Sequence, residues 1–262
     1  DPELRLDVDL FKRTGDSMAD AKDLLLALGA PKPITLASGV GGVQGLGEAV
    51  RSLFNGPRSG VVWALNKLTY YTMKKRAGVV GCGLALLLKR LSIDHDIRLH
   101  LVGHSFGGRL VTAAANALPD VKHLKFFSLT LLQAAYSHNG LTRGKGPFAG
   151  VVGKPSGPIS FTHTHNDKAC TIAYPIASRL VRDNRLGLGD SNDEFGAMGA
   201  NGPQITGSYL APLCTTTDFH PVPGKINRFL ADSYIVKTAS IDAHNNVTNE
   251  QCGRLVAAAM TA

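Results

Sequence analysis

The sequence has no long apolar segment and few charges. None of its apolar runs approaches the roughly 18 residues that a membrane-spanning helix needs, and the run 79–88 leads directly into Lys89 and Arg90. Charged residues make up 18% of the 262 residues, and the basic residues behind the net charge of +8 are scattered. These absences argue against a membrane span and against nucleic acid as a partner.

The cysteines are sparse as well. Cys82, Cys170, Cys214 and Cys252 form no Cys-x-x-Cys pair, which argues against a tetrathiolate zinc site and leaves buried thiols or disulfides. No signal peptide is visible, and the sequence begins at Asp1 rather than at methionine. We therefore expect a cytoplasmic protein whose N-terminus has been processed or truncated.

The length and the hydrophobic content of 44% suit one α/β domain over 1–262, with an irregular or helical part over 1–60 and the core over 61–262. Strand-like and helical patterns alternate without an internal repeat. They predict a mostly parallel sheet flanked by helices, with long loops over its carboxyl edge. The expected strands are 34–37, 97–102, 124–132, 159–165 and 234–241. The expected helices include 17–28, 63–91 interrupted at Gly78, Gly81 and Gly83, 168–180, and a final helix from a capping box at Thr248 and Gln251 through Ala259.

One segment joins a strand, a reactive side chain and a helix. The apolar run 97–102, which we expect to be buried, leads into Gly-x-Ser-x-Gly and then into helical spacing. This pattern is typical of a nucleophile elbow, a strained turn that exposes Ser105 and directs the N–H of Phe106 at a developing oxyanion. We expect Gly103 and Gly107 to be required, because a side chain at either would collide with the neighbouring strand and helix. The elbow residues are Gly103, His104, Ser105, Phe106, Gly107 and Gly108.

A serine hydroxyl needs an imidazole to take its proton and a carboxylate to orient that imidazole. In a doubly wound hydrolase topology the acid and then the base follow later strands. His244 follows the last expected strand, so we predict it as the base, with His220 as its rival. Asp167 follows the strand 159–165 and is the predicted acid, although an aspartate there also suits an N-cap.

Two other patterns compete with this interpretation. His163, His165 and Asp167 stand at alternate positions, on one face of an extended segment, and resemble part of the His-x-His-x-Asp motif of the metallo-β-lactamase superfamily. That motif continues with histidine where this chain has Lys168. The basic segment 74–76 predicts a solvated helix face, or the binding surface of a non-catalytic module.

The motif Gly-His-Ser-Phe-Gly-Gly, with Asp167 and His244 after later strands, resembles the α/β-hydrolase fold superfamily over about 63–262. The segments 71–78, 99–111 and 131–135 are similar to uncharacterised bacterial serine-hydrolase-like proteins of esterase or lipase type. The resemblance implies an α/β-hydrolase fold. The His-Gly-type loop that brings the second oxyanion amide in such proteins is absent. Three alternatives stay open: Gly39–Gly42 supplies the second oxyanion amide, Gly39–Gly42 is only a flexible connector, or the missing strand and loop lie upstream of Asp1.

Together these observations predict a serine hydrolase that cleaves a carboxylic ester through an acyl-enzyme. Ser105 would attack, His244 would act as base and then acid, Asp167 would orient the imidazole, and Phe106 N–H would stabilise the oxyanion. The expected substrate is a small or lipid-like ester, and no cofactor or metal is required. The loops 136–158 and 182–225 would overhang the elbow and shape the pocket.

Overall fold

The computed structural model describes residues 57–93, 95–174, 196–205 and 207–262. Contacts between Cα atoms divide the chain into two units, one of Lys74–Ala262 with Asp1–Leu4 and one of Arg5–Met73. The first unit carries all the strands that the structure describes. The expected helix 17–28, the strand 34–37 and the Gly39–Gly42 turn lie outside the described residues.

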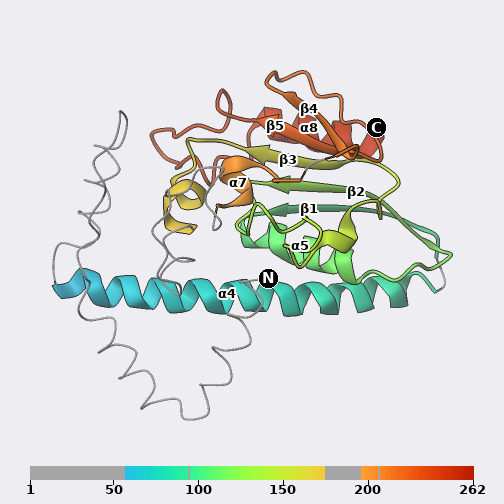
Figure 1. The fold of residues 1–262 in the computed structure, drawn as a ribbon, viewed down its shortest axis with the longest axis horizontal. Coiled ribbons are helices and arrows are strands. Elements are labelled where there is room, and N and C mark those ends of the chain that lie inside the picture. Colours follow the sequence, from blue (N-terminus) through green and yellow to red (C-terminus); the bar gives the residue numbers. More distant parts are fainter. Residues whose placement is uncertain (1–56, 94, 175–195, 206) are drawn as a thin grey trace, which may run out of the picture. The chain divides into compact units, whose positions relative to one another are not determined.

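Five parallel strands form one sheet, which confirms the α/β class and the parallel sheet predicted from the sequence (Figure 1). Their order by hydrogen bonding is β1-β2-β3-β5-β4. Because the strands run in one direction, their carboxyl ends meet at one edge of the sheet, where the following loops converge. The strands are β1 Ile97–His104, β2 Leu124–Leu132, β3 Ile159–His163, β4 Leu210–Cys214 and β5 Ile226–Leu230.

Helices cover both faces of this sheet. Helix α5 (Phe106–Ala117) follows β1 and packs on the face that carries Leu129. Helix α8 (Glu250–Thr261) packs on the other face, with Leu132 and Phe229. Successive side chains of a strand point to opposite faces, so β2 contributes to both cores. Burying each such leucine or phenylalanine stabilises the fold by about 1.5–3 kcal/mol.

Helix α4 (Pro57–Leu91) is continuous, so the expected interruption at its glycines is wrong. A Cβ at Gly78 or Gly83 would meet nothing within 4 Å, whereas a Cβ at Gly81 would lie 2.8 Å from the Cβ of Ala113. Gly81 therefore permits close contact between α4 and α5. A helical glycine costs roughly 1 kcal/mol relative to alanine, and packing outweighs that cost here. No helix in the described part of the chain has the length and apolar character needed to cross a membrane.

The last strand lies earlier in the chain than the sequence predicted. Segment 234–241 holds turns, bends and irregular residues rather than a strand. Strand β5 precedes it and pairs with β4, which the sequence did not predict. The apolar side chains of Tyr234 and Ile235 are buried in the core beneath α8 without joining the sheet. Asn227 and Arg228 interrupt the apolar pattern of β5, which explains why periodicity favoured the wrong segment.

Several predicted element ends also move. Strand β3 ends at His163, two residues before the predicted end, and a short π-helical turn, η2 (Ala169–Ala173), opens the helix expected over 168–180. The rest of that helix lies beyond the described residues. The N-cap of α8 is Asn249, whose side chain accepts a hydrogen bond from Cys252 N at 2.9 Å, rather than Thr248.

Two further expectations are wrong, one about the burial of Val102 and one about the course of the loop 136–158. Val102 of β1, expected to be buried, is 42% exposed. The loop 136–158 leaves the carboxyl edge in its second half, because Lys154 Nζ donates to Ala115 O, Asn116 O and Leu118 O at 3.2, 2.6 and 3.1 Å. These carbonyls end α5, some ~18 Å along the helix from its start. Only the first part of this loop can border the turn at Ser105.

Candidate active site

The turn between β1 and α5 holds Ser105 in an unusual backbone conformation. Its φ is 56° and its ψ is −124°, and it is one of two described non-glycine residues with positive φ. Three hydrogen bonds fix this backbone: Ser105 N donates to Leu132 O at 3.2 Å, and Ser105 O accepts from Gly108 N and Ala135 N, both at 3.0 Å. Such strain persists only where the surroundings impose it, and it is common at functional sites.

The glycines that this turn requires are Gly103 and Gly108, whereas the sequence predicted Gly103 and Gly107. A Cβ at Gly103 would lie 2.7 Å from Val111 Cγ2, so glycine is required there as predicted. A Cβ at Gly107 would meet nothing within 4 Å, so the prediction for Gly107 is wrong. Gly108 is the second constrained position, since its Cβ would lie 2.8 Å from the Cβ of Ala134. The helix must therefore approach both β1 and the end of β2 closely.

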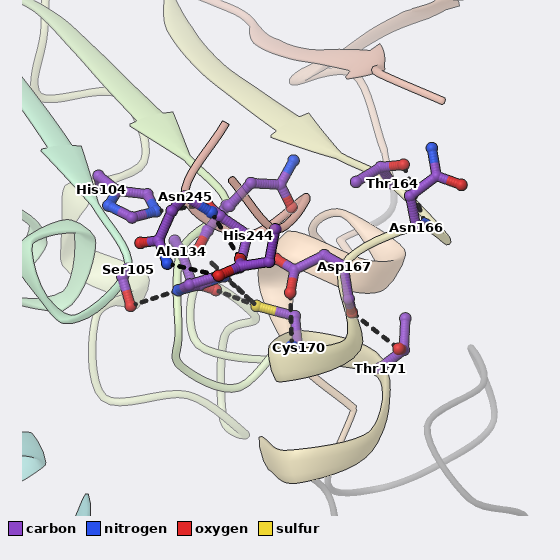
Figure 2. Close-up of polar contacts among 12 residues, drawn as sticks. His104, Ser105, Ala134, Thr164, Asn166, Asp167, Cys170, Thr171, His244 and Asn245 are labelled. Carbon is purple, nitrogen blue, oxygen red and sulfur yellow. Dashed lines mark hydrogen bonds and ion pairs between the residues drawn. The ribbon is translucent and has the colours of Figure 1, made fainter. Parts of the chain in front are cut away.

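Ser105, His244 and Asp167 form one chain of hydrogen bonds (Figure 2). Ser105 Oγ lies 2.8 Å from His244 Nε2, and His244 Nδ1 lies 2.7 Å from Asp167 Oδ2. The three side chains follow β1, β3 and β5, so the carboxyl edge of the parallel sheet brings them together. The two distances are those of a nucleophile and a base whose ring a carboxylate orients.

The carboxylate of Asp167 is fully buried and accepts from two further groups. Its Oδ1 accepts from Cys170 N at 3.0 Å, so the N-cap interpretation and the acid interpretation both describe this side chain. With its amide nitrogen on that side, Gln133 donates to Asp167 Oδ2 at 3.0 Å and to Gly199 O at 2.6 Å. Hydrogen bonds of this kind fix the direction of the carboxylate.

A turn after β5 holds His244. Asp242 accepts from Asn245 N and Asn245 Nδ2 at 3.0 and 2.9 Å, which closes the turn around the histidine. His104 Nε2 donates to His244 O at 2.8 Å, and the two rings lie 4.8 Å apart between centroids. Burial lowers the pKa of His104, which suits a neutral ring that supports the backbone of His244.

Cys170 lies beside this chain of hydrogen bonds (Figure 2). Its Sγ is 3.9 Å from His244 Nδ1 and 3.7 Å from Gln133 O. Burial, together with the neighbouring Asp167 carboxylate, raises the pKa of the thiol well above its ordinary value. The thiol is therefore no alternative nucleophile, because reactive cysteines have a lowered pKa.

The rival residues lie elsewhere. His220 pairs with Asp218 at 3.0 Å on the surface, where both side chains are exposed. His165 Nδ1 lies 2.9 Å from Asp232 Oδ2, while Asp167 faces His244, so His163, His165 and Asp167 do not converge as a metal site would require. Among the described residues, the three side chains of the metallo-β-lactamase-like set are therefore not arranged to bind one metal ion together.

Two other expectations concern the surroundings of the turn. Phe106 is the first residue of α5, directly after Ser105, and its role as oxyanion donor stays a prediction. Gly39–Gly42, considered as a source of the second oxyanion amide, lies outside the described residues. Lys74 is 2% exposed and its carbonyl accepts from Arg109 Nε, so the proposed basic surface at 74–76 does not present all three charges.

Sequence reasoning missed Gln133 and Cys170. Gln133 directly follows β2, the strand between those that precede Ser105 and Asp167, so a polar residue after the apolar run 124–132 was a usable signal. Cys170 lies three residues after Asp167, a spacing that brings side chains together only once the segment is helical. Neither signal identifies a site residue until the order of the strands is known.

Comparison with protein-family models, with curated proteins and with solved structures finds no match for this chain.

Proposed function

We propose that this protein is a serine hydrolase of the α/β-hydrolase type that cleaves a carboxylic ester through an acyl-enzyme. One observation carries the proposal: Ser105 Oγ is 2.8 Å from His244 Nε2, and His244 Nδ1 is 2.7 Å from a fully buried Asp167. Residues 105, 167 and 244 follow separate strands in the order nucleophile, acid, base that this fold uses.

The roles follow from the atoms that face one another. In the neutral ring of His244 the proton resides on Nδ1 and is donated to Asp167, so the lone pair of Nε2 accepts the hydroxyl proton of Ser105. The Ser105 oxygen then attacks the ester carbonyl carbon, and His244 returns the proton to the leaving alcohol. Water, activated by the same imidazole, releases the acyl group.

The charge that forms on the carbonyl oxygen needs donors fixed in advance. Phe106 N–H is our candidate, because it lies at the positive end of the α5 dipole, directly after the nucleophile. The strained φ of 56° at Ser105 supports this arrangement, since the same turn sets the direction of the hydroxyl and of the following amide.

A fluorophosphonate probe tests the proposal, because it modifies only an activated serine. We expect labelling of Ser105 in the wild-type protein and none in Ser105→Ala. Ser128→Ala is the matched control: the buried Ser128 has its Oγ 2.8 Å from Nδ1 of the half-buried His100, whose ring is bonded to no carboxylate among the described residues. It should label normally. A folded wild-type protein that resists the probe, or a Ser105→Ala variant that still reacts, would refute the proposal.

A further inference from the structure

Asp167, Cys170 and His244 form a cluster of metal-ligand atoms inside the candidate active site. One carboxylate oxygen, the Cys170 Sγ and one ring nitrogen all lie within 4.8 Å of one another. Cys170 Sγ and His244 Nδ1 are 3.9 Å apart (Figure 2). The proposed hydrolysis uses Asp167 and His244 but gives no task to the thiol. The three residues are the only such group in the part of the chain that the structure describes.

The ligand types and the spacing suit zinc. Zinc in proteins binds thiolate, imidazole and carboxylate at about 2.0–2.3 Å in tetrahedral geometry, which places neighbouring ligand atoms ~3.3–3.8 Å apart. The nitrogen and oxygen are 2.7 Å apart and the sulfur and nitrogen 3.9 Å, so shifts of less than about 1 Å would bring them to zinc distances. Three protein ligands would leave the fourth position for water.

The charge balance favours an ion of charge +2 at this place. Asp167 and Cys170 are both fully buried, and the Cys170 thiolate that metal binding requires would be stable there only beside an opposite charge. A carboxylate and a thiolate together neutralise Zn²⁺, and the imidazole binds as a neutral ligand. The soft thiolate also favours zinc over magnesium or calcium, which prefer oxygen ligands.

We propose that Zn²⁺ binds Asp167, Cys170 and His244 Nδ1 and that the bound ion switches off Ser105. Metal binding needs the lone pair of Nδ1, so the ring proton moves from Nδ1 to Nε2, and the Cys170 thiol releases its proton to solvent. One proton is released for each zinc ion. Nε2 then donates to Ser105 Oγ, so the imidazole can no longer accept the hydroxyl proton of Ser105. The inhibition rests on the proposed function, whereas the binding does not.

The local chain explains why Cys170 is in place. Asp167 and Cys170 are three residues apart at the start of the η2 turn, where Cys170 N donates to Asp167 Oδ1. The same hydrogen bond that orients the carboxylate therefore directs the sulfur toward it. His244 arrives from the turn after β5, so the metal site and the catalytic arrangement share one histidine through its two ring nitrogens.

The test compares Cys170→Ala and Cys170→Ser with Cys252→Ala, which removes a buried thiol from α8. Binding is measured with ZnCl2 by calorimetry and with Co²⁺ through its thiolate charge-transfer absorption. The rate of fluorophosphonate labelling is measured with and without ZnCl2, relative to the metal-free rate of each variant. Circular dichroism verifies that each variant folds, and the serine variant retains most of the side-chain volume.

We expect one Zn²⁺ equivalent in the wild type and in Cys252→Ala, with labelling suppressed by the metal. Both Cys170 variants should bind at least about 100-fold more weakly, since loss of a second-shell partner alone costs 10–100-fold. Equal zinc sensitivity in Cys170→Ala would overturn the inference and leave the proposed function intact. A Cys170-dependent cobalt absorption in a protein that never labels at Ser105 would support the binding and refute the hydrolase together with its inhibition.

Discussion

Two histidine–carboxylate pairs at the carboxyl edge of the sheet have nearly the same contact and different surroundings. His244 Nδ1 lies 2.7 Å from Asp167, and His165 Nδ1 lies 2.9 Å from Asp232. The side chains of the first pair are 14% and 0% exposed, and those of the second are 73% and 39% exposed. Burial, with Ser105 at the second nitrogen, therefore distinguishes a candidate catalytic pair from a surface pair.

The exposed pair has a structural explanation. Asp232 follows β5 and accepts from Thr164 Oγ1 and His165 N at 2.6 and 2.9 Å, so it ties the end of β3 to the end of β5. Solvent screens such a pair, which typically contributes 0–1 kcal/mol. A water-excluded pair acts at low dielectric, where orientation and charge have much larger effects.

The largest expected difference comes from removing each histidine. His244→Ala should lower ester turnover by about 10⁶-fold, as much as Ser105→Ala, because nucleophile and base act as a unit. His165→Ala should retain turnover within about twofold, because its effect is limited to a pair of ~0–1 kcal/mol. Steady-state kinetics on a short-chain ester measures both. A fully active His244→Ala would contradict the comparison and move the base to another histidine.

Neutralising each carboxylate tests orientation without removing volume. Asp167→Asn should lower kcat by about 10⁴-fold, because an amide favours the wrong tautomer of His244. Asp232→Asn should leave kcat nearly unchanged and reduce stability only slightly. The measurement is kcat for both variants, with urea unfolding as the stability control. Similar losses of kcat in the two variants would show that burial does not separate the pairs.

His163 is a buried histidine with no carboxylate bonded to its ring among the described residues. Burial, reinforced by the charges of Arg228 and His165 and opposed by Asp232, lowers its pKa to about 4. The unfolded chain, with a pKa near 6.5, binds the proton first, so stability is lost as pH falls from about 6.5 to 4.

Between pH 8 and 4.5 this residue should account for a loss of about 2–3 kcal/mol in the free energy of unfolding. In His163→Gln the free energy of unfolding should fall by about 2–3 kcal/mol less over this pH range. His165→Gln should lose as much stability as the wild type. Urea unfolding at the two pH values measures the difference. Equal pH dependence in the wild type and in His163→Gln would contradict the assignment.

Gln133 distinguishes the two pairs further, because its amide donates to Asp167 of the buried pair and, among the described residues, makes no hydrogen bond to His165 or Asp232. Gln133→Leu should lower kcat by roughly tenfold with little change in KM, since one hydrogen bond to a buried carboxylate contributes about 1.5 kcal/mol. Gln204→Leu is the control: its amide donates to Asn201 O, away from Ser105, so it should affect stability alone. A change in KM without a change in kcat would assign Gln133 to substrate binding.

The smallest effect is expected at Asp232. Burial acts to raise the pKa of this carboxyl, but the hydrogen bonds from Thr164 and His165 outweigh it and hold the pKa below its ordinary value. The resulting stability is present above the ordinary pKa of an aspartate and is lost as pH falls through the lowered one. In Asp232→Asn the free energy of unfolding should decrease less as the pH falls, and the difference from the wild type should be below about 1 kcal/mol. Thermal unfolding from pH 5 to 2.5 measures it, with Asp218→Asn as an exposed control.

The elements predicted best from the sequence are those whose local pattern and packing agree. The run 124–132 matches β2 at both ends, and the strand, turn and helix around Ser105 lie where the motif places them. The sequence pattern failed at the glycines of α4 and at the polar Asn227 in β5, because the packing that accommodates them involves distant residues. Tyr234 is apolar in pattern because it is buried against α8, and that pattern wrongly predicted a strand.

The order of Ser105, Asp167 and His244 and the strained turn at Ser105 could be predicted from the sequence alone, because strand, glycine and serine are local features of the chain. The sequence did not determine that Gly108 rather than Gly107 must lack a side chain, or that Gln133 and Cys170 contact Asp167. Those facts depend on which strands lie side by side. The order β1-β2-β3-β5-β4 is set by the packing of the whole sheet, and no short segment carries that information.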